Sequence, residues 1–92
     1  MIKVIKIIKI QSKFIDCELN NGIKKRITLG PLFKKHSNFK GIEQLQNMQF
    51  LKTAQIGQFG EIYWKDVVTS SNNEKWNYDI SPEFINFHGE SI

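Results

Sequence analysis

Three carboxylates, Asp66, Asp79 and Glu83, are the residues whose types and spacing come nearest to acid–base chemistry in this sequence. Two carboxylates can act as acid and base when their environments push their pKa values apart. A simpler interpretation is available, because Asp79 precedes a predicted helix and Glu83 lies in its first turn. A negative charge there stabilises the helix by about 0.3–1 kcal/mol. We therefore predict no catalytic residues, and an enzyme remains the weakest alternative, to be revived by a deep pocket around Asp66 or Asp79.

The histidines and the single cysteine do not form a recognisable metal or nucleophile site. His36 and His88 lie far apart and have no partner at metal-binding spacing. We expect His36 to be solvated in a lysine-rich loop and His88 to end a helix. Cys17 is the only cysteine, so an intrachain disulfide is excluded. It alternates with Ile15 and Leu19, which predicts that its small side chain is buried. No metal or cofactor is predicted, and a reducing, cytoplasmic setting is expected.

Basic residues are concentrated in the first part of the chain. Residues 1–40 hold ten of the thirteen bases and only two acids, whereas residues 41–92 are acidic overall. Such a basic half could contact nucleic acid, and Lys24, Lys25 and Arg26 are the candidate contacts. Arginine is preferred for contacts with phosphates and bases, yet only Arg26 is an arginine. The competing interpretation is a solvated lysine face on a sheet edge.

The first thirty residues predict three strands. Residues 2–10 are rich in Ile and Val, although a lysine at every third position fits no regular alternation. Apolar and polar residues alternate over residues 13–20, which predicts a second strand. Residues 23–29 are predicted to form a third strand after the turn Asn20-Asn21-Gly22. Asn-Gly between alternating segments predicts a hairpin with a two-residue type I′ turn. Gly30-Pro31 then ends the third strand.

The remaining elements complete an α+β pattern within one predicted domain, residues 1–92. We expect a short helix over residues 42–48, a hairpin of strands 50–58 and 61–65, and a loop over residues 65–77. A second short helix is expected over residues 82–87, with Ser81 as its N-cap and Pro82 in its first position. The predicted fold is thus a small antiparallel sheet, a three-stranded meander plus a hairpin, with two short helices. No apolar run approaches the ~18 residues of a membrane span, so no membrane association is expected.

Three motifs together suggest a family. Leu19-Asn20-Asn21-Gly22, the strand Ile62-Tyr63-Trp64 and the segment Asp79-Ile80-Ser81-Pro82-Glu83 resemble the bacterial domain-of-unknown-function family 2442 over nearly the whole chain. The resemblance implies a small α+β domain, often encoded beside another small uncharacterised protein, with no enzymatic activity. The sequence departs from the family pattern between Trp64 and Asp79, where members have a tighter turn.

Our functional prediction is a non-catalytic binding module that acts through a protein partner. The family resemblance suggests a bacterial gene pair of the toxin–antitoxin kind. A nucleic-acid-binding module that uses the lysine-rich half is the alternative. Most aromatic residues are predicted to be core, and Trp76 is the exception, since it follows a loop tip and becomes a candidate contact. The partner and the oligomeric state stay open at this point.

Overall fold

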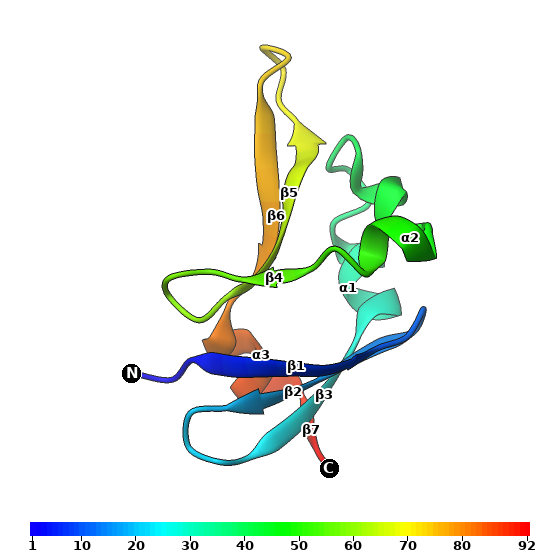
Figure 1. Cartoon of the computed structure of the whole chain (residues 1–92). Helices are drawn as coiled ribbons and strands as arrows, with labels where there is room; N and C mark the ends of the chain where they lie inside the picture. The colour runs from blue at the N-terminus through cyan, green and yellow to red at the C-terminus, as the bar shows by residue number, and fades with distance from the viewer.

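Two antiparallel sheets form the framework of the protein in a computed structural model that describes residues 1–92 (Figure 1). The first sheet has the strand order β1-β2-β3-β7 and the second has the order β4-β5-β6. Three short α-helices and one 3₁₀ helix complete the chain. The predicted α+β class is confirmed, but the meander and the hairpin belong to separate sheets.

Strand β1 (Val4–Ile10) contains two bulges, which explain its lysine repeat. Its register against β2 (Phe14–Leu19) shifts between Val4 and Lys6 and again between Ile7 and Lys9. Each shift adds one residue to β1 and resets its alternation. Val4, Ile7 and Ile10 consequently all turn toward the core at steps of three, while the lysines between them stay exposed.

The β2–β3 hairpin forms as predicted, but its turn differs from the predicted type. Gly22 N–H donates to the carbonyl of Leu19, and Leu19 N–H donates to the carbonyl of Ile23, which closes a three-residue loop before β3 (Lys24–Thr28). Only Gly22 in this loop has a positive φ, of 84°. A type I′ turn needs positive φ at both of its central residues, so the type I′ prediction is wrong.

Helix α1 (Leu29–Lys35) begins directly after β3, where we expected the end of a strand at Gly30-Pro31 and a lysine-rich loop around His36. Pro31 ends the strand as expected, but it lies in the first turn of a helix, where a missing N–H costs little. Leu29 and Leu32 are buried on one side of the helix. The apolar spacing of these two residues was the signal for it.

The predicted helix near residue 45 is present as the 3₁₀ helix η1 (Ile42–Gln46), and a further helical turn, α2 (Met48–Leu51), follows it. The predicted strand over residues 50–58 is therefore mostly wrong, since only β4 (Gln55–Ile56) is extended. Asn47 accepts a hydrogen bond from Gln49 N–H and caps α2. Leu51 is buried as a helix residue, which the apparent alternation concealed.

Strands β5 (Ile62–Thr69) and β6 (Lys75–Ile80) form a long hairpin. The sequence predicted the first half of β5, as the strand over residues 61–65, but the assignment of residues 65–77 to a loop is wrong. Its tip is a short loop in which Ser70 N–H donates to the carbonyl of Glu74. A bulge separates the Trp64–Tyr78 pair from the Val68–Trp76 pair. Figure 1 shows this hairpin extending away from the four-stranded sheet.

Helix α3 (Pro82–His88) follows the predicted bounds closely. Ser81 is its N-cap, accepting a hydrogen bond from Phe84 N–H, and Pro82 occupies its first position. The chain then forms β7 (Glu90–Ser91), which pairs with β3. One cluster of sixteen buried apolar residues connects both sheets and the helices. At its centre Trp64 is fully buried, and its Nε1 donates to the carbonyl of Leu51 at 2.8 Å.

Candidate functional site

The three predicted basic contacts do not form one surface. Successive side chains on a strand point to opposite faces of the sheet. Lys24 and Arg26 therefore lie on the outer face, away from the core, whereas Lys25 points to the inner face. There the Lys25 Nζ lies 3.4 Å from the carbonyl of Gly89, to which it donates. The fold separates Lys25 from the other two.

Arg26 is held by a carboxylate from the neighbouring strand. Its Nε and a terminal nitrogen donate to the two carboxylate oxygens of Asp16 at 2.8 and 3.0 Å, and its guanidinium lies 3.9 Å from the ring centre of Phe14. These hydrogen bonds hold the pKa of Asp16 below its ordinary value, although burial opposes the shift. Arg26 is therefore committed to an intramolecular ion pair.

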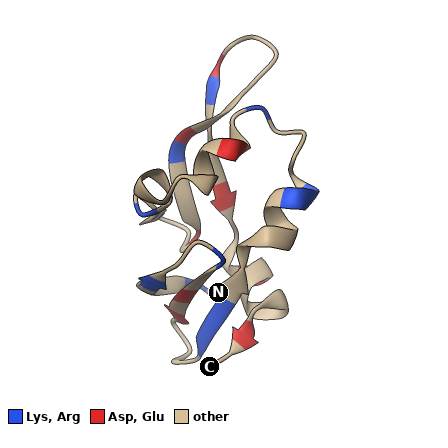
Figure 2. Ribbon diagram, turned by 90° about the vertical axis from the view of Figure 1, so that its right-hand side faces the viewer, with Lys and Arg blue, Asp and Glu red and all other residues tan.

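The same pattern continues across the four-stranded sheet. Lys9 is paired in register with Asp16, Asp16 with Arg26, and Arg26 with Glu90. Basic and acidic segments accordingly lie next to one another in the lower sheet of Figure 2. We call these four residues the charge ladder. The charge ladder places two of the ten bases of residues 1–40, Lys9 and Arg26, opposite carboxylates, so these two are less available for contact with nucleic acid.

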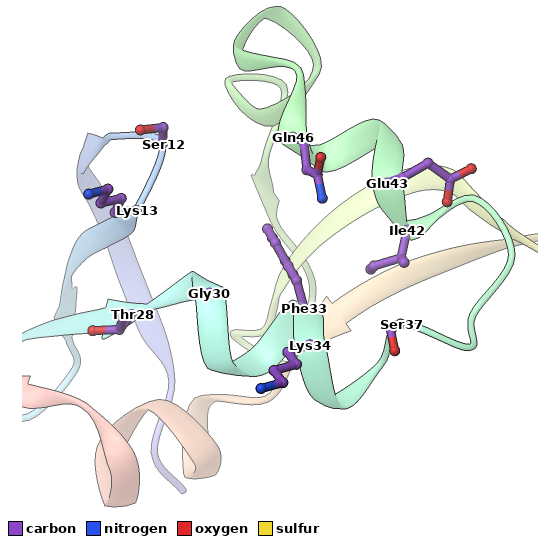
Figure 3. Close-up of a pocket in the computed structure, with 10 residues that line it drawn as sticks. All are labelled: Ser12, Lys13, Thr28, Gly30, Phe33, Lys34, Ser37, Ile42, Glu43 and Gln46. Carbon is purple, nitrogen blue, oxygen red and sulfur yellow. The ribbon is translucent and has the colours of Figure 1, made fainter.

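The largest cavity is an open cleft of about 570 Å³ between the β1–β2 turn, α1 and η1. Phe33 points from α1 toward η1, and Ile42 and Gln46 point back toward it (Figure 3). Glu43 points away from the cleft, since its Oε2 accepts a hydrogen bond from Gly41 N–H at 3.2 Å. The cleft thus has an apolar centre and a polar rim, without a group arranged for acid–base chemistry.

A second groove, of about 380 Å³, lies against β6 and is largely aromatic. His36 Nδ1 is 2.8 Å from the hydroxyl oxygen of Tyr78, and the His36 ring stacks on Phe39 with centroids 4.8 Å apart. The expectation that His36 is solvated is therefore wrong, because the end of α1 brings it against β6. Burial lowers the pKa of His36, with Lys35 adding to the effect, and raises that of Tyr78 to about 12.

Trp76 borders this aromatic groove and is the most exposed large apolar side chain of the hairpin, with 57% of its surface accessible. The predicted exposure of Trp76 is confirmed, but the prediction that most other aromatic residues are core is wrong: only Trp64 and Tyr78 are buried, and Phe59 and Phe87 are more exposed than Trp76, at 60% and 83%. It lies on β6, an edge strand that pairs with β5 alone. A large aromatic residue beside a groove and an unpaired strand edge is an arrangement that suits the binding of another chain.

The three carboxylates considered for acid–base chemistry, Asp66, Asp79 and Glu83, lie in different parts of the structure. Asp66 lies in the β5 bulge with a φ of 58°, where its N–H donates to Asn77 Oδ1 at 3.1 Å. Glu83 lies in the first turn of α3, as predicted. Asp79 borders the aromatic groove, and burial raises its pKa, with the nearby carboxylate of Glu61 adding to the shift. No cavity contains two of the three.

Cys17 is fully buried, as predicted from its alternation with Ile15 and Leu19. Burial raises the pKa of its thiol to about 11, and Asp16 contributes to the same shift. The thiol is thus protonated at neutral pH and enclosed by apolar side chains. No group of three or more histidine, cysteine, aspartate or glutamate side chains lies close enough together to hold a metal ion.

The helices of the protein are all shorter or more polar than a helix that crosses a membrane. When the chain is compared with known proteins, no protein family, curated protein or solved structure matches it. The aromatic groove with Trp76 and the unpaired edge of β6 are the two features of the structure that favour binding of another chain.

Proposed function

We propose that this protein is a small non-catalytic binding module that docks another protein chain along the unpaired edge of β6. The single observation that carries the proposal is the position of Trp76, which is 57% exposed on that edge strand and borders the aromatic groove. Tryptophan is enriched among the residues that dominate binding energy at protein interfaces.

The backbone of β6 has hydrogen-bonding groups available for such a chain. Ser70 N–H donates to the carbonyl of Glu74, so Glu74 turns its backbone toward β5. Backbone groups of successive residues alternate between the two edges of an antiparallel strand. Lys75, Asn77 and Asp79 therefore direct their N–H and C=O groups away from β5. Figure 1 shows no helix or strand beyond β6 on its left side, above the β4–β5 turn.

The other long edge strand of the protein is protected, which makes β6 the better docking edge. Strand β1 has two bulges, which discourage pairing with another chain. Its first residue, Val4, already donates its N–H to the carbonyl of Gly60 at 3.0 Å. In the β5–β6 pair the extra residues of the bulge lie on β5, and β6 itself is free of bulges. The contrast supports a role for the β6 edge in binding.

The resemblance to family 2442 adds a first candidate for the bound chain. Because members of that family are often encoded beside another small protein, the product of the neighbouring gene is one candidate, to be compared with a second copy of this chain. A two-gene system of the toxin–antitoxin kind is the proposed biological setting.

Site-specific photo-crosslinking in the native host tests this proposal. A benzophenone amino acid in place of Trp76 is expected to give one cross-linked protein product on illumination. The matched control has the same amino acid in place of Lys65, which is exposed on the neighbouring strand β5. The proposal fails if position 76 gives no protein product, or if positions 65 and 76 give the same products in equal yield.

A further inference from the structure

We propose that the chain bound at β6 is a second copy of this protein, joined by antiparallel pairing of the two β6 strands about a two-fold axis at Asn77. The inference rests on the proposed function, because it names the occupant of the same edge. The supporting observation is the order of residues on β6, Lys75-Trp76-Asn77-Tyr78-Asp79-Ile80. When two such strands run antiparallel about Asn77, lysine meets aspartate and tryptophan meets tyrosine.

The hydrogen-bonding phase of the free edge agrees with this axis. Lys75, Asn77 and Asp79 present their backbone groups to the free edge, as derived above from the Ser70–Glu74 hydrogen bond. Antiparallel pairing centred on Asn77 places Asn77 opposite Asn77, and Lys75 opposite Asp79 of the second copy. Every residue with outward backbone groups thus meets another such residue, as a hydrogen-bonded antiparallel pair requires.

Charge selects the same register. With the axis at Asn77, Lys75 of each copy lies opposite Asp79 of the other, which gives two pairs of opposite charge. An axis at Lys75 would place two lysines opposite each other, and an axis at Asp79 would place two aspartates opposite each other. Asp79 also lies near the carboxylate of Glu61 in its own chain, and a lysine from the second copy would offset that repulsion.

The aromatic side of the hairpin is complementary in the same way. Pairing centred on Asn77 sets Trp76 opposite Tyr78 of the second copy. Tyr78 lines the aromatic groove together with His36 and Phe39. Each Trp76 is thereby directed toward the groove of the other copy, and the two contacts are identical by symmetry. Such reciprocal contacts are the defining property of a two-fold interface.

Charge reversal followed by mixing tests the inference on the purified chain. In analytical ultracentrifugation the native protein is expected to dimerise with increasing concentration. Lys75→Glu would put glutamate opposite aspartate, and Asp79→Lys would put lysine opposite lysine, so each variant alone is expected to remain monomeric. Mixed together, the two variants place opposite charges in both pairs and are expected to form a heterodimer. Lys65→Glu, outside the edge, is expected to dimerise like the native chain.

A native chain that stays monomeric at millimolar concentration would overturn the inference, as would a dimer that both charge reversals leave intact. The mixing experiment protects the result against misfolding, because a misfolded variant would not be rescued by its complement. The cross-linked product at position 76 separates this inference from the proposed function. A product with the mass of a different protein refutes the second copy and leaves the docking edge in place, whereas no product refutes both.

Discussion

Arg26 is fixed in the structure by Asp16, which lies opposite it on β2. Arg26 was a candidate for nucleic-acid contact because of its residue type, and its surroundings make it part of the charge ladder instead. The signal for this pairing was present in the sequence. Once the hairpin turn is placed at Asn20–Gly22, Asp16 and Arg26 are equidistant from its centre. Composition describes the total charge of a segment, whereas register decides which charges remain free.

Replacing Asp16 with asparagine is expected to destabilise the protein in a pH-dependent way. The folded-state pKa of Asp16 lies below its unfolded value, so its carboxylate stabilises the fold above the unfolded pKa of about 4. This stabilisation is lost as the pH falls through the lower, folded-state pKa. Urea unfolding at a series of pH values should therefore show a gap between native protein and Asp16→Asn at neutral pH that closes in acid. A gap that is independent of pH would contradict the assigned ion pair.

The element that the sequence described least well is the β5–β6 hairpin. Alternation on β5 is interrupted at the bulge, where Asp66 adopts a positive φ and its N–H binds the side chain of Asn77. Lys75-Trp76-Asn77 is polar and exposed, and it follows a serine- and asparagine-rich tip, so it has the composition of a loop. Exposed edge strands lack the apolar alternation of half-buried strands, which is why β6 was assigned to a loop.

Helix boundaries were predictable where capping chemistry determines them. Ser81 and Pro82 mark the start of α3 in sequence and in structure alike. Strand β1 was predictable only in part. Its residue types indicated a strand, but its two bulges change the alternation of its side chains, so the spacing of its lysines matched no regular strand. A bulge is set by contacts with the partner strand, and a local pattern does not contain them.

A pair of glycines tests the corrected β2–β3 turn. An added methyl group would have no neighbour within 4 Å at either Gly22 or Gly30, but only Gly22 has a positive φ, of 84°. Gly22→Ala is therefore expected to cost roughly 1–2 kcal/mol of unfolding free energy. Gly30→Ala, in helix α1, is expected to be neutral or stabilising by up to about 1 kcal/mol. Urea denaturation of both variants provides the comparison, and equal effects would argue against the left-handed conformation at Gly22.

At the scale of the whole molecule, the aromatic groove and the free edge of β6, the two features of the proposed binding site, lie at one end of the second sheet. The shared core joins the sheets through Trp64, while the end of α1 brings His36 and Phe39 to the face of β6. These residues are about forty positions apart in the sequence from Tyr78, so no local pattern could predict the aromatic groove. The α+β class followed from the order of elements, and the groove follows from long-range packing.

Amide hydrogen exchange at the β6 edge is the most direct test of the account. Exchange of the Lys75, Asn77 and Asp79 amides should be fast at micromolar protein concentration and should slow markedly at millimolar concentration, because the second copy supplies their acceptors. The Trp76 and Tyr78 amides face β5 and should be protected at both concentrations. Fast exchange of the three edge amides at every concentration would contradict self-association through β6.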